Sequence, residues 1–274
     1  FRLFSTKLFC CLEKNNLRRC FYKIYRKIAM KGFVAIYLRE LLLLKKRFFR
    51  VLLSFSINPL LYILAFGIGL GKNITVMGRP YLEFLLPGLI AASSMLQAFA
   101  INVEINVARF YLKVFEEFQS APISSISFAL GEIFSGITRA FLSVFLILLI
   151  GVLLGGIHIK ITLLFLGIIF LNAFIFASLG LASAMAIKAH ADQTLITNFI
   201  ITPMMFLGGT FFPIENLPTF VQPIIEFLPV SITSQTLRAH LWSEMVDYHK
   251  VLVLIICAFI SFFISIYTIK KAKD

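Results

Sequence analysis

The sequence predicts an all-α, polytopic membrane protein with six transmembrane helices. Hydrophobic residues make up 59% of its 274 residues and charged residues only 14%, whereas soluble domains contain about 45–50% and about 25%. The apolar residues fall in long runs, most of which reach the roughly 20 residues that a helix needs to cross a bilayer. The runs lack the alternation of a membrane β-barrel. Because backbone groups in lipid must be satisfied within their own segment, such runs form helices.

The first fifty residues are predicted to lie outside the bilayer. Residues 1–30 form a basic cytoplasmic tail, and the position of the first methionine, Met30, also allows an upstream extension. Residues 31–50 have helical periodicity, with basic residues on one side and Glu40 intruding on the apolar face. This pattern predicts an amphipathic helix in the membrane interface, and a plain extension of the first span is the alternative. The two faces consist of Phe33, Ile36, Tyr37, Leu44 and Phe48, and of Arg39, Lys46 and Arg50.

Six apolar runs are predicted to be the transmembrane spans. The first contains Asn58-Pro59, which predicts a kink. The third is long enough to tilt in the bilayer. The fourth is rich in small residues between Ala177 and Ala184, which allow another helix to approach closely. The runs are residues 51–71, 84–106, 127–155, 161–187, 194–212 and 250–269, and a short tail, 271–274, ends the chain.

Two connecting segments have a distinctive composition. Residues 109–126 interleave aromatic and charged side chains and contain a proline, Pro122. They predict an amphipathic cytoplasmic helix, which either docks in a groove of a soluble partner or lies on the inner leaflet without one. Residues 213–249 contain four prolines among many apolar residues. This segment is too interrupted to span and too apolar for a free loop, so we expect two short helices in the outer interface, with re-entry into the bilayer left open.

The orientation follows from the positions of Lys and Arg. Alternate connections on one side, including both termini, contain 20 of the 26 basic residues, and the other side contains 5. Arg139 lies within the third span. Because cytoplasmic loops carry the excess of basic residues, both termini are predicted to be cytoplasmic in a multi-pass membrane protein. Fourteen basic residues fall within residues 1–50, which favours contact with anionic lipid over nucleic acid, for which no binding module accompanies the charge.

Four ionisable residues fall in or near the predicted spans: Glu104, Arg109, Glu132 and Arg139. Charges at this depth must face protein or water and find partners. Glu132 and Arg139 share one helix face but lie about 10 Å apart along the axis. We therefore expect partners on other helices, with Glu104 or Glu132 near the cytoplasmic third of the membrane and Arg139 reaching toward that level. Both a purely structural network and a gating or substrate-binding role are open.

The sequence contains no recognisable catalytic or metal-binding arrangement. The four histidines have no H-E-x-x-H spacing, and the glycines at 67, 69 and 71 lack the spacing of a phosphate-binding loop. The four cysteines have no metal-ligand spacing, and three of them lie in the predicted cytoplasmic tail. We therefore expect a protein that is not an enzyme and binds neither a metal nor ATP itself.

Several short motifs follow one another in a distinctive order along residues 31–270. They are YLRE at 37–40, YLEFLLPGL at 81–89, FEE at 115–117, APIS at 121–124, GEI at 131–133, PMMFLGGTFFP at 203–213, and the Leu-Pro pairs at 217–218 and 228–229. The motifs are individually weak but specific in their order and spacing. In this order they resemble the permeases of ABC type-2 transporters, closest to the branch of nodulation-factor and daunorubicin-type exporters.

The resemblance implies a role for each part of the chain. Residues 110–121, within the loop 109–126, would form a coupling helix seated in a cleft of a separate cytoplasmic ATPase subunit, beside the interface helix with Arg39 and Glu40. Residues 213–241 would form outer re-entrant helices over the translocation path. The family's usual Gly-Thr is replaced by Phe118-Gln119. The implied coupling residues are Phe115, Glu116, Glu117, Phe118 and Pro122, and those of the outer segment are Gly208, Gly209, Pro213, Pro218 and Pro229.

The resemblance therefore implies one permease subunit of an ATP-driven exporter, located in a bacterial plasma (inner) membrane. The subunit would pair with a second copy, most simply as a homodimer, and ATP and Mg²⁺ would bind to the ATPase partner. Because no sizeable outer domain is predicted, the cargo would be released directly across or into the membrane, as a lipid-linked glycan or polysaccharide, or an amphipathic small molecule. An ion-coupled secondary transporter is the first alternative, although no internal repeat is evident. A membrane-embedded lipid-modifying enzyme is the second.

Overall fold

The computed structural model describes residues 32–71, 74–111, 123–155 and 161–273. Helices dominate these residues, with a single hairpin of two short antiparallel strands, β1 and β2. The elements, in chain order, are α3 (Gly32–Lys46), α4 (Phe48–Tyr62), η1 (Ile63–Leu70), β1 (Thr75–Val76), β2 (Arg79–Pro80), α5 (Tyr81–Phe99), α6 (Ile101–Asn106), η3 (Val107–Tyr111), α8 (Ser125–Gly155), α9 (Leu163–Ala186), α10 (His190–Ile196), η4 (Thr197–Ile201), α11 (Thr202–Leu207), η5 (Ile214–Asn216), α12 (Gln222–Glu226), α13 (Pro229–Leu241) and α14 (Tyr248–Lys273).

Within the described ranges, five helices are long and apolar enough to cross a membrane. They are Phe48–Gly69, Tyr81–Tyr111, Ser125–Leu154, Leu163–Ala186 and Tyr248–Ala272. Each coincides with a predicted span to within a few residues at most ends, so the helical, polytopic character is confirmed. The remaining predicted span, 194–212, corresponds to α10, η4 and α11, which run without a break over residues 190–207. This segment begins with polar residues and is not among the five, so a sixth crossing stays a prediction.

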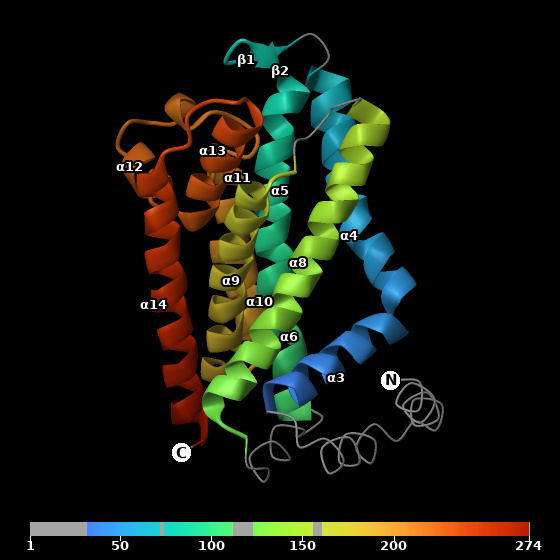
Figure 1. Cartoon of the computed structure of the whole chain (residues 1–274), viewed down its shortest axis with the longest axis vertical. Coiled ribbons are helices and arrows are strands. Elements are labelled where there is room, and N and C mark those ends of the chain that lie inside the picture. The colour runs from blue at the N-terminus through green and yellow to red at the C-terminus, as the bar shows by residue number, and fades with distance from the viewer. Residues whose placement is uncertain (1–31, 72–73, 112–122, 156–160, 274) are drawn as a thin grey trace.

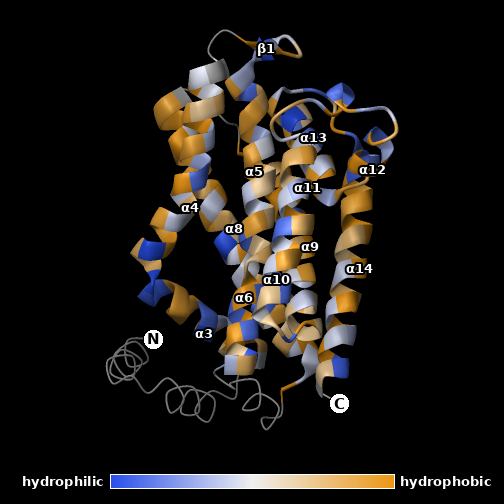
Figure 2. Cartoon of the chain, turned by 180° about the vertical axis from the view of Figure 1, so that it is seen from behind, coloured by the Kyte–Doolittle hydropathy of each residue, from blue (hydrophilic) through white to orange (hydrophobic). Residues whose placement is uncertain are grey.

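The long helices lie side by side, with α5, α8 and α9 in mutual contact (Figure 1). The most apolar stretch of Tyr81–Tyr111 is 78% buried, whereas that of Phe48–Gly69 is 22% buried and that of Tyr248–Ala272 is 28% buried. The span formed by α5, α6 and η3 is therefore the centre of the bundle, and α4 and α14 are peripheral helices. Their exposed faces are apolar, as the hydropathy colouring indicates (Figure 2).

Small residues allow the central helices to pack backbone against side chain. A Cβ atom at Gly180 of α9 would lie 2.8 Å from the carbonyl oxygen of Phe99, and one at Gly136 of α8 would lie 2.9 Å from the Cβ of Ala177. Real Cβ atoms do not approach this closely, so only glycine fits at both positions. The prediction that small residues near the end of the fourth span serve close packing agrees with this contact.

A polar group joins α9 to its neighbours deep in the bundle. The amide nitrogen of Asn172 donates to the carbonyl oxygen of Ala91 at 3.0 Å and to the Ser94 hydroxyl at 2.7 Å. Its amide oxygen accepts from the Thr233 hydroxyl of α13 at 3.2 Å. Because Asn172 is fully buried, these bonds satisfy a side chain that would otherwise oppose burial.

The short helices η5, α12 and α13, which follow α11, lie at the upper end of the bundle in Figure 1, close to the hairpin. Here α13 packs against α5 and α9, and eight of its thirteen residues are buried. Its polar residues thus lie inside the protein, whereas the sequence predicted short helices resting in the outer interface.

At the opposite end, α3 packs on the first half of α8 and runs outward to α4 (Figure 1). A Cβ atom at Gly131 would lie 2.6 Å from the Ile36 side chain. The close approach of α3 to α8 therefore requires a residue without a side chain at position 131. The Tyr37 and Thr138 hydroxyls lie 2.9 Å apart and share a hydrogen bond. The helix ends at Lys46, and Arg47 leaves helical geometry before α4 begins, so the predicted interface helix 31–50 is shorter at its C-terminal end.

Candidate functional site

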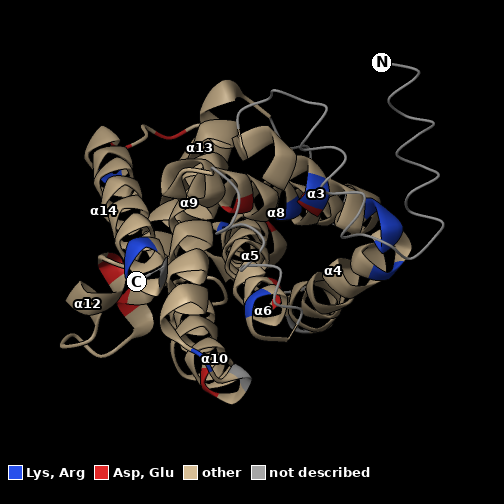
Figure 3. Ribbon diagram, turned by 90° about the horizontal axis from the view of Figure 1, so that it is seen from below, with Lys and Arg blue, Asp and Glu red and all other residues tan. Residues whose placement is uncertain are grey.

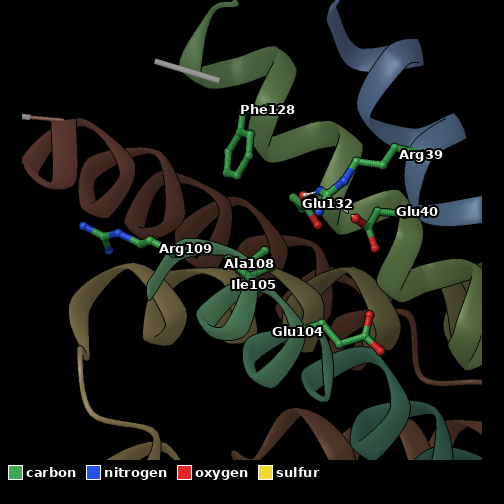
Figure 4. Close-up of a pocket in the computed structure, with 8 residues that line it drawn as sticks. All are labelled: Arg39, Glu40, Glu104, Ile105, Ala108, Arg109, Phe128 and Glu132. Atoms are coloured by element: carbon green, nitrogen blue, oxygen red, sulfur yellow. Dashed lines mark ion pairs between the residues drawn. The ribbon is translucent and has the colours of Figure 1, made fainter. Parts of the chain in front are cut away.

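Five charged side chains from three elements gather at the lower end of the bundle. Arg39 and Glu40 come from α3, Glu104 comes from α6, and Glu132 and Arg139 come from α8; we call these residues the charge cluster. Figure 4 shows the three carboxylates and Arg39 converging around a pocket between these elements. The sequence placed Glu104, Glu132 and Arg139 in one network and left Glu40 apart. The structure adds Glu40 and Arg39 to them.

Most of the ion pairs in the cluster join different helices. Arg139 pairs with Glu104 of α6 and lies 3.8 Å from the Glu40 carboxylate of α3. Arg39 lies 2.9 Å from Glu40 and 3.9 Å from Glu132. Arg39 and Arg139 therefore connect α3 to α8, and Arg139 also connects α8 to α6.

Most of the cluster is removed from water. Glu40, Glu132 and Arg139 are buried, whereas the Glu104 side chain is 43% exposed. Burial raises the pKa of the Glu40 carboxyl above its ordinary value; Glu104 acts in the same direction, and Arg39 and Arg139 oppose both. Three carboxylates face two guanidinium groups, so loss of either arginine leaves buried negative charge without compensation.

The pocket beside the cluster is too small for a cargo molecule. Its free volume is about 20 Å³, which is room for about one water molecule. The side chains that line it also include Ile105, Ala108 and Phe128. No group of three or more potential metal ligands occurs in the described part of the chain. This arrangement is suited to fastening helices together rather than to binding substrate or to catalysis.

Arg109 points away from the carboxylates in Figure 4 and makes a different set of contacts. Its guanidinium group donates to the carbonyl oxygen of Met185 at 2.6 Å, at the end of α9, and to that of Ala272 at 3.5 Å, at the end of α14. The Asn106 amide donates to the Ile187 carbonyl oxygen at 3.1 Å. The last carbonyl groups of a helix lack partners within the helix and carry partial negative charge. Arg109 and Asn106 therefore join α6 and η3 to the ends of α9 and α14.

The predicted coupling residues, Phe115, Glu116, Glu117, Phe118 and Pro122, lie outside the described residues. The structure does place the two ends between which they lie. η3 ends at Tyr111, two residues after Arg109, and α8 begins at Ser125, seven residues before Glu132. Both elements that flank the loop, η3 and α8, thus carry residues that bind neighbouring helices at the lower end of the bundle.

The predicted residues of the outer segment surround a turn at the upper end. Gly209 has φ +71°, which favours glycine, and its carbonyl oxygen accepts from Arg238. The Gly208 carbonyl oxygen accepts from the Ser234 hydroxyl at 3.0 Å. Three prolines flank the short helices: Pro213 precedes η5, Pro218 accepts a turn hydrogen bond, and Pro229 begins α13.

Arg238 is a structurally important residue that the sequence analysis did not single out. In the sequence it counted only as one basic residue in an outer loop. It is 6% exposed, and its Nε donates to the Phe84 carbonyl oxygen at 3.1 Å. Its guanidinium carbon lies 3.8 Å from the centre of the Phe84 ring. Asn172 was also missed, because a single amide side chain within an apolar run forms no recognisable sequence motif. The only signal for Arg238 was its position within an unusually apolar connection.

Comparison with known proteins agrees with this architecture. Residues 31–242 match the family model described as "ABC-2 type transporter". The chain is 28% identical over 209 residues to nodulation protein J of Rhizobium leguminosarum bv. viciae, covering 76% of this chain and 81% of that protein. It is 26% identical over 189 residues to the inner membrane transport permease YadH of Escherichia coli K12, covering 67% and 74%.

The family match includes α3, the charge cluster, the central helices and the buried α13, and so extends over most of the described structure. The resemblance to the nodulation-type branch, drawn from the sequence motifs, is confirmed by the relatives. The chain therefore belongs to the ABC-2 type transporter family and is a transmembrane permease subunit of an ABC transporter.

Proposed function

We propose that this chain is the permease subunit of an ATP-driven exporter. Two copies would form the membrane channel, and a separate ATPase subunit would bind each copy. The ATPase would bind the loop 109–126 at the lower end, which would be cytoplasmic. The geometry at this end supports the proposal most directly, because the loop connects two elements that are each fastened to further helices. Membership of the ABC-2 type transporter family supports the partnership with an ABC ATPase.

The hydrogen bonds and ion pairs at this end suggest how movement of the loop would be transmitted to the helices. On one side, η3 is joined by Arg109 to the ends of α9 and α14. On the other side, α8 is joined by Glu132 and Arg139 to α3 and α6. A displacement of the loop by ATP-driven closure of the ATPase pair would therefore move these six helical elements as a unit, in a rigid-body transition of the kind that packed interfaces permit.

The cargo would pass between the two copies, and the segment 213–241 would form re-entrant helices over the outer end of the path. Burial of α13 between α5 and α9 supports this placement. We propose a lipid-linked glycan or polysaccharide, or an amphipathic small molecule, as the cargo class. The single-water pocket at the charge cluster supports a mechanical rather than a cargo-binding role for these charges.

Charge reversal in the loop tests the proposed coupling. The variant Glu116→Arg with Glu117→Arg should insert and fold normally but lose ATPase binding and ATP-dependent transport in reconstituted vesicles. The matched control, Glu244→Arg with Asp247→Arg, reverses two exposed charges outside both this loop and the segment 213–241 and should keep both activities. Normal ATP-dependent transport by the loop variant would contradict the coupling assignment.

The nature of the energy source needs a separate measurement. The unsubstituted chain, purified in mild detergent from its own membranes, should retain a P-loop ATPase, and transport should stop when that subunit is omitted from the vesicles. Transport that persists without the ATPase and follows an imposed ion gradient would instead indicate a secondary carrier. Chemical modification of a lipid without net transport would indicate the membrane-embedded enzyme.

A further inference from the structure

The junction between α3 and α4 presents a compact basic surface. Lys46, Arg47 and Arg50 are all exposed within five residues of sequence, and we call these three residues the basic corner. Two aromatic side chains lie between them: Phe48 is 40% exposed and Phe49 is 81% exposed. Seen from below, Lys and Arg gather where α3 meets α4 (Figure 3).

The charged residues in this part of the sequence are all basic. From Leu41 to Leu82 the sequence contains no Asp or Glu, and Lys45 adds a fourth exposed basic residue directly before the corner. By contrast, Arg39, two turns earlier on α3, pairs with Glu40 and Glu132. The acidic partners on α3 and α8 are thus engaged by Arg39 and Arg139, and the basic corner extends beyond them.

The depth of the corner follows from the helix that it begins. Phe48 is the first residue of the candidate span Phe48–Gly69, whose side chains at Leu53, Ile57 and Leu61 are more than half exposed. A helix of this length and composition crosses the hydrocarbon core, so its first turn lies at the boundary with the lipid headgroups. The basic corner therefore lies at the level of the lipid headgroups, where long basic side chains and aromatic rings are both favoured.

The other end of α3 is held by protein. Ile36 fills the space over Gly131, and the Phe33 ring packs edge-on against Phe134 with centroids 5.5 Å apart. These contacts fix the first turns of α3 on α8, while the exposed cations lie at its C-terminal end and in the first turn of α4. The occupant of the corner must therefore be negatively charged, present at the membrane surface, and compatible with an exposed phenylalanine.

We propose that the basic corner is a binding site for the phosphate headgroups of anionic phospholipids, in the leaflet at the lower end of the bundle. Lys46, Arg47 and Arg50 bind the phosphate oxygens, and Phe49 lies among the upper acyl carbons. This site is independent of cargo and of ATP. Because α3 also carries Arg39 and Glu40, lipid bound at the corner holds the helix in the position that completes the charge cluster.

Quenching of a tryptophan at the corner by brominated lipid tests the site in the full-length chain. Trp242 is the only tryptophan, so Phe49→Trp combined with Trp242→Phe gives a single reporter at the corner. The protein is reconstituted without an ATPase into mixed vesicles in which either phosphatidylglycerol or phosphatidylcholine carries the bromine. Brominated phosphatidylglycerol should quench more strongly at equal mole fraction, with a preference of about fivefold for each cation that meets the headgroup.

Two further variants identify the residues responsible. Lys46→Gln, Arg47→Gln and Arg50→Gln, added together to the reporter, should bring the preference to about one. The control pair Lys270→Gln and Lys271→Gln, exposed cations on α14, should leave it unchanged. High salt should weaken the preference, because screening shortens the range of the attraction.

Each of the other outcomes would overturn the proposal. Equal quenching by the two brominated lipids would show that the corner has no affinity for the anionic headgroup. A preference that survives the triple substitution would place the site elsewhere. A preference that free glycerol phosphate abolishes at millimolar concentration would indicate a soluble phosphate ligand. If the lipid preference is absent and the triple variant loses its ATPase in pull-downs, the corner is a protein docking surface.

Discussion

Removal of the Arg139 side chain should destabilise the chain far more than removal of an exposed arginine. In Arg139→Met, buried Glu40 and Glu132 keep only Arg39 as a cation, whereas Glu104 is 43% exposed and regains water. Breaking a buried pair by removing one partner costs about 3–5 kcal/mol, and nearly all of this loss should come from the two buried carboxylates.

Arg79→Met is the matched control, because Arg79 also pairs with one glutamate but is 40% exposed. Its ion pair with Glu83 contributes at most about 1 kcal/mol. Its position over the Trp242 ring, 5.2 Å from the centre, adds about 0.5–1 kcal/mol. The control should therefore lose at most about 2 kcal/mol.

The measurement is equilibrium unfolding of the purified chain in mixed micelles, with helix content followed by circular dichroism as the fraction of dodecyl sulfate rises. The double variant Arg139→Met with Glu40→Gln removes one of the uncompensated charges and should recover part of the loss, since coupled residues are not additive. The argument is wrong if Arg139→Met and Arg79→Met differ by less than about 1 kcal/mol, or if the second substitution restores nothing.

Three further substitutions test other parts of the structure. Because burial raises the pKa of Glu40, the native carboxyl binds a proton more readily than the unfolded one, and its contribution to stability falls as the pH rises above the ordinary pKa of a glutamate. Glu40→Gln should therefore gain stability relative to the unsubstituted chain over that rise, and unfolding midpoints showing the reverse trend would refute this. Gly180→Val places a Cβ atom 2.8 Å from a backbone oxygen and should cost about 1–3 kcal/mol in thermal unfolding, whereas Gly167→Ala, where a Cβ atom meets nothing within 4 Å, should cost nothing. Arg238→Met leaves the carbonyl groups of Phe84 and Gly209 without their donor and should cost about 1–3 kcal/mol for each, with faster amide exchange in residues 209–228; unchanged exchange there would rule out Arg238 as the fastening of this segment.

The charge cluster shows why the sequence predicted the members of a site better than their pairing. Glu104, Glu132 and Arg139 were identifiable because a charge within an apolar run is costly and must find a partner. The same reasoning could not find that partner, since the carboxylates nearest to Arg139 lie on α3 and α6, 99 and 35 residues away along the chain. Glu40 looked like an exception on an amphipathic helix, yet it is buried beside Arg39 and Arg139.

The sequence by itself determined the helical, membrane-spanning class, the limits of five spans and the family, because bilayer thickness and backbone hydrogen bonding act on each segment locally. Its motifs also located the two unusual connections. Only the tertiary structure decided that α13 and Arg238 are buried, that Asn172 joins three helices, and that α3 packs on α8 through Gly131. These features depend on close contacts between segments far apart in sequence, and an apolar run looks the same whether its neighbour is lipid or another helix.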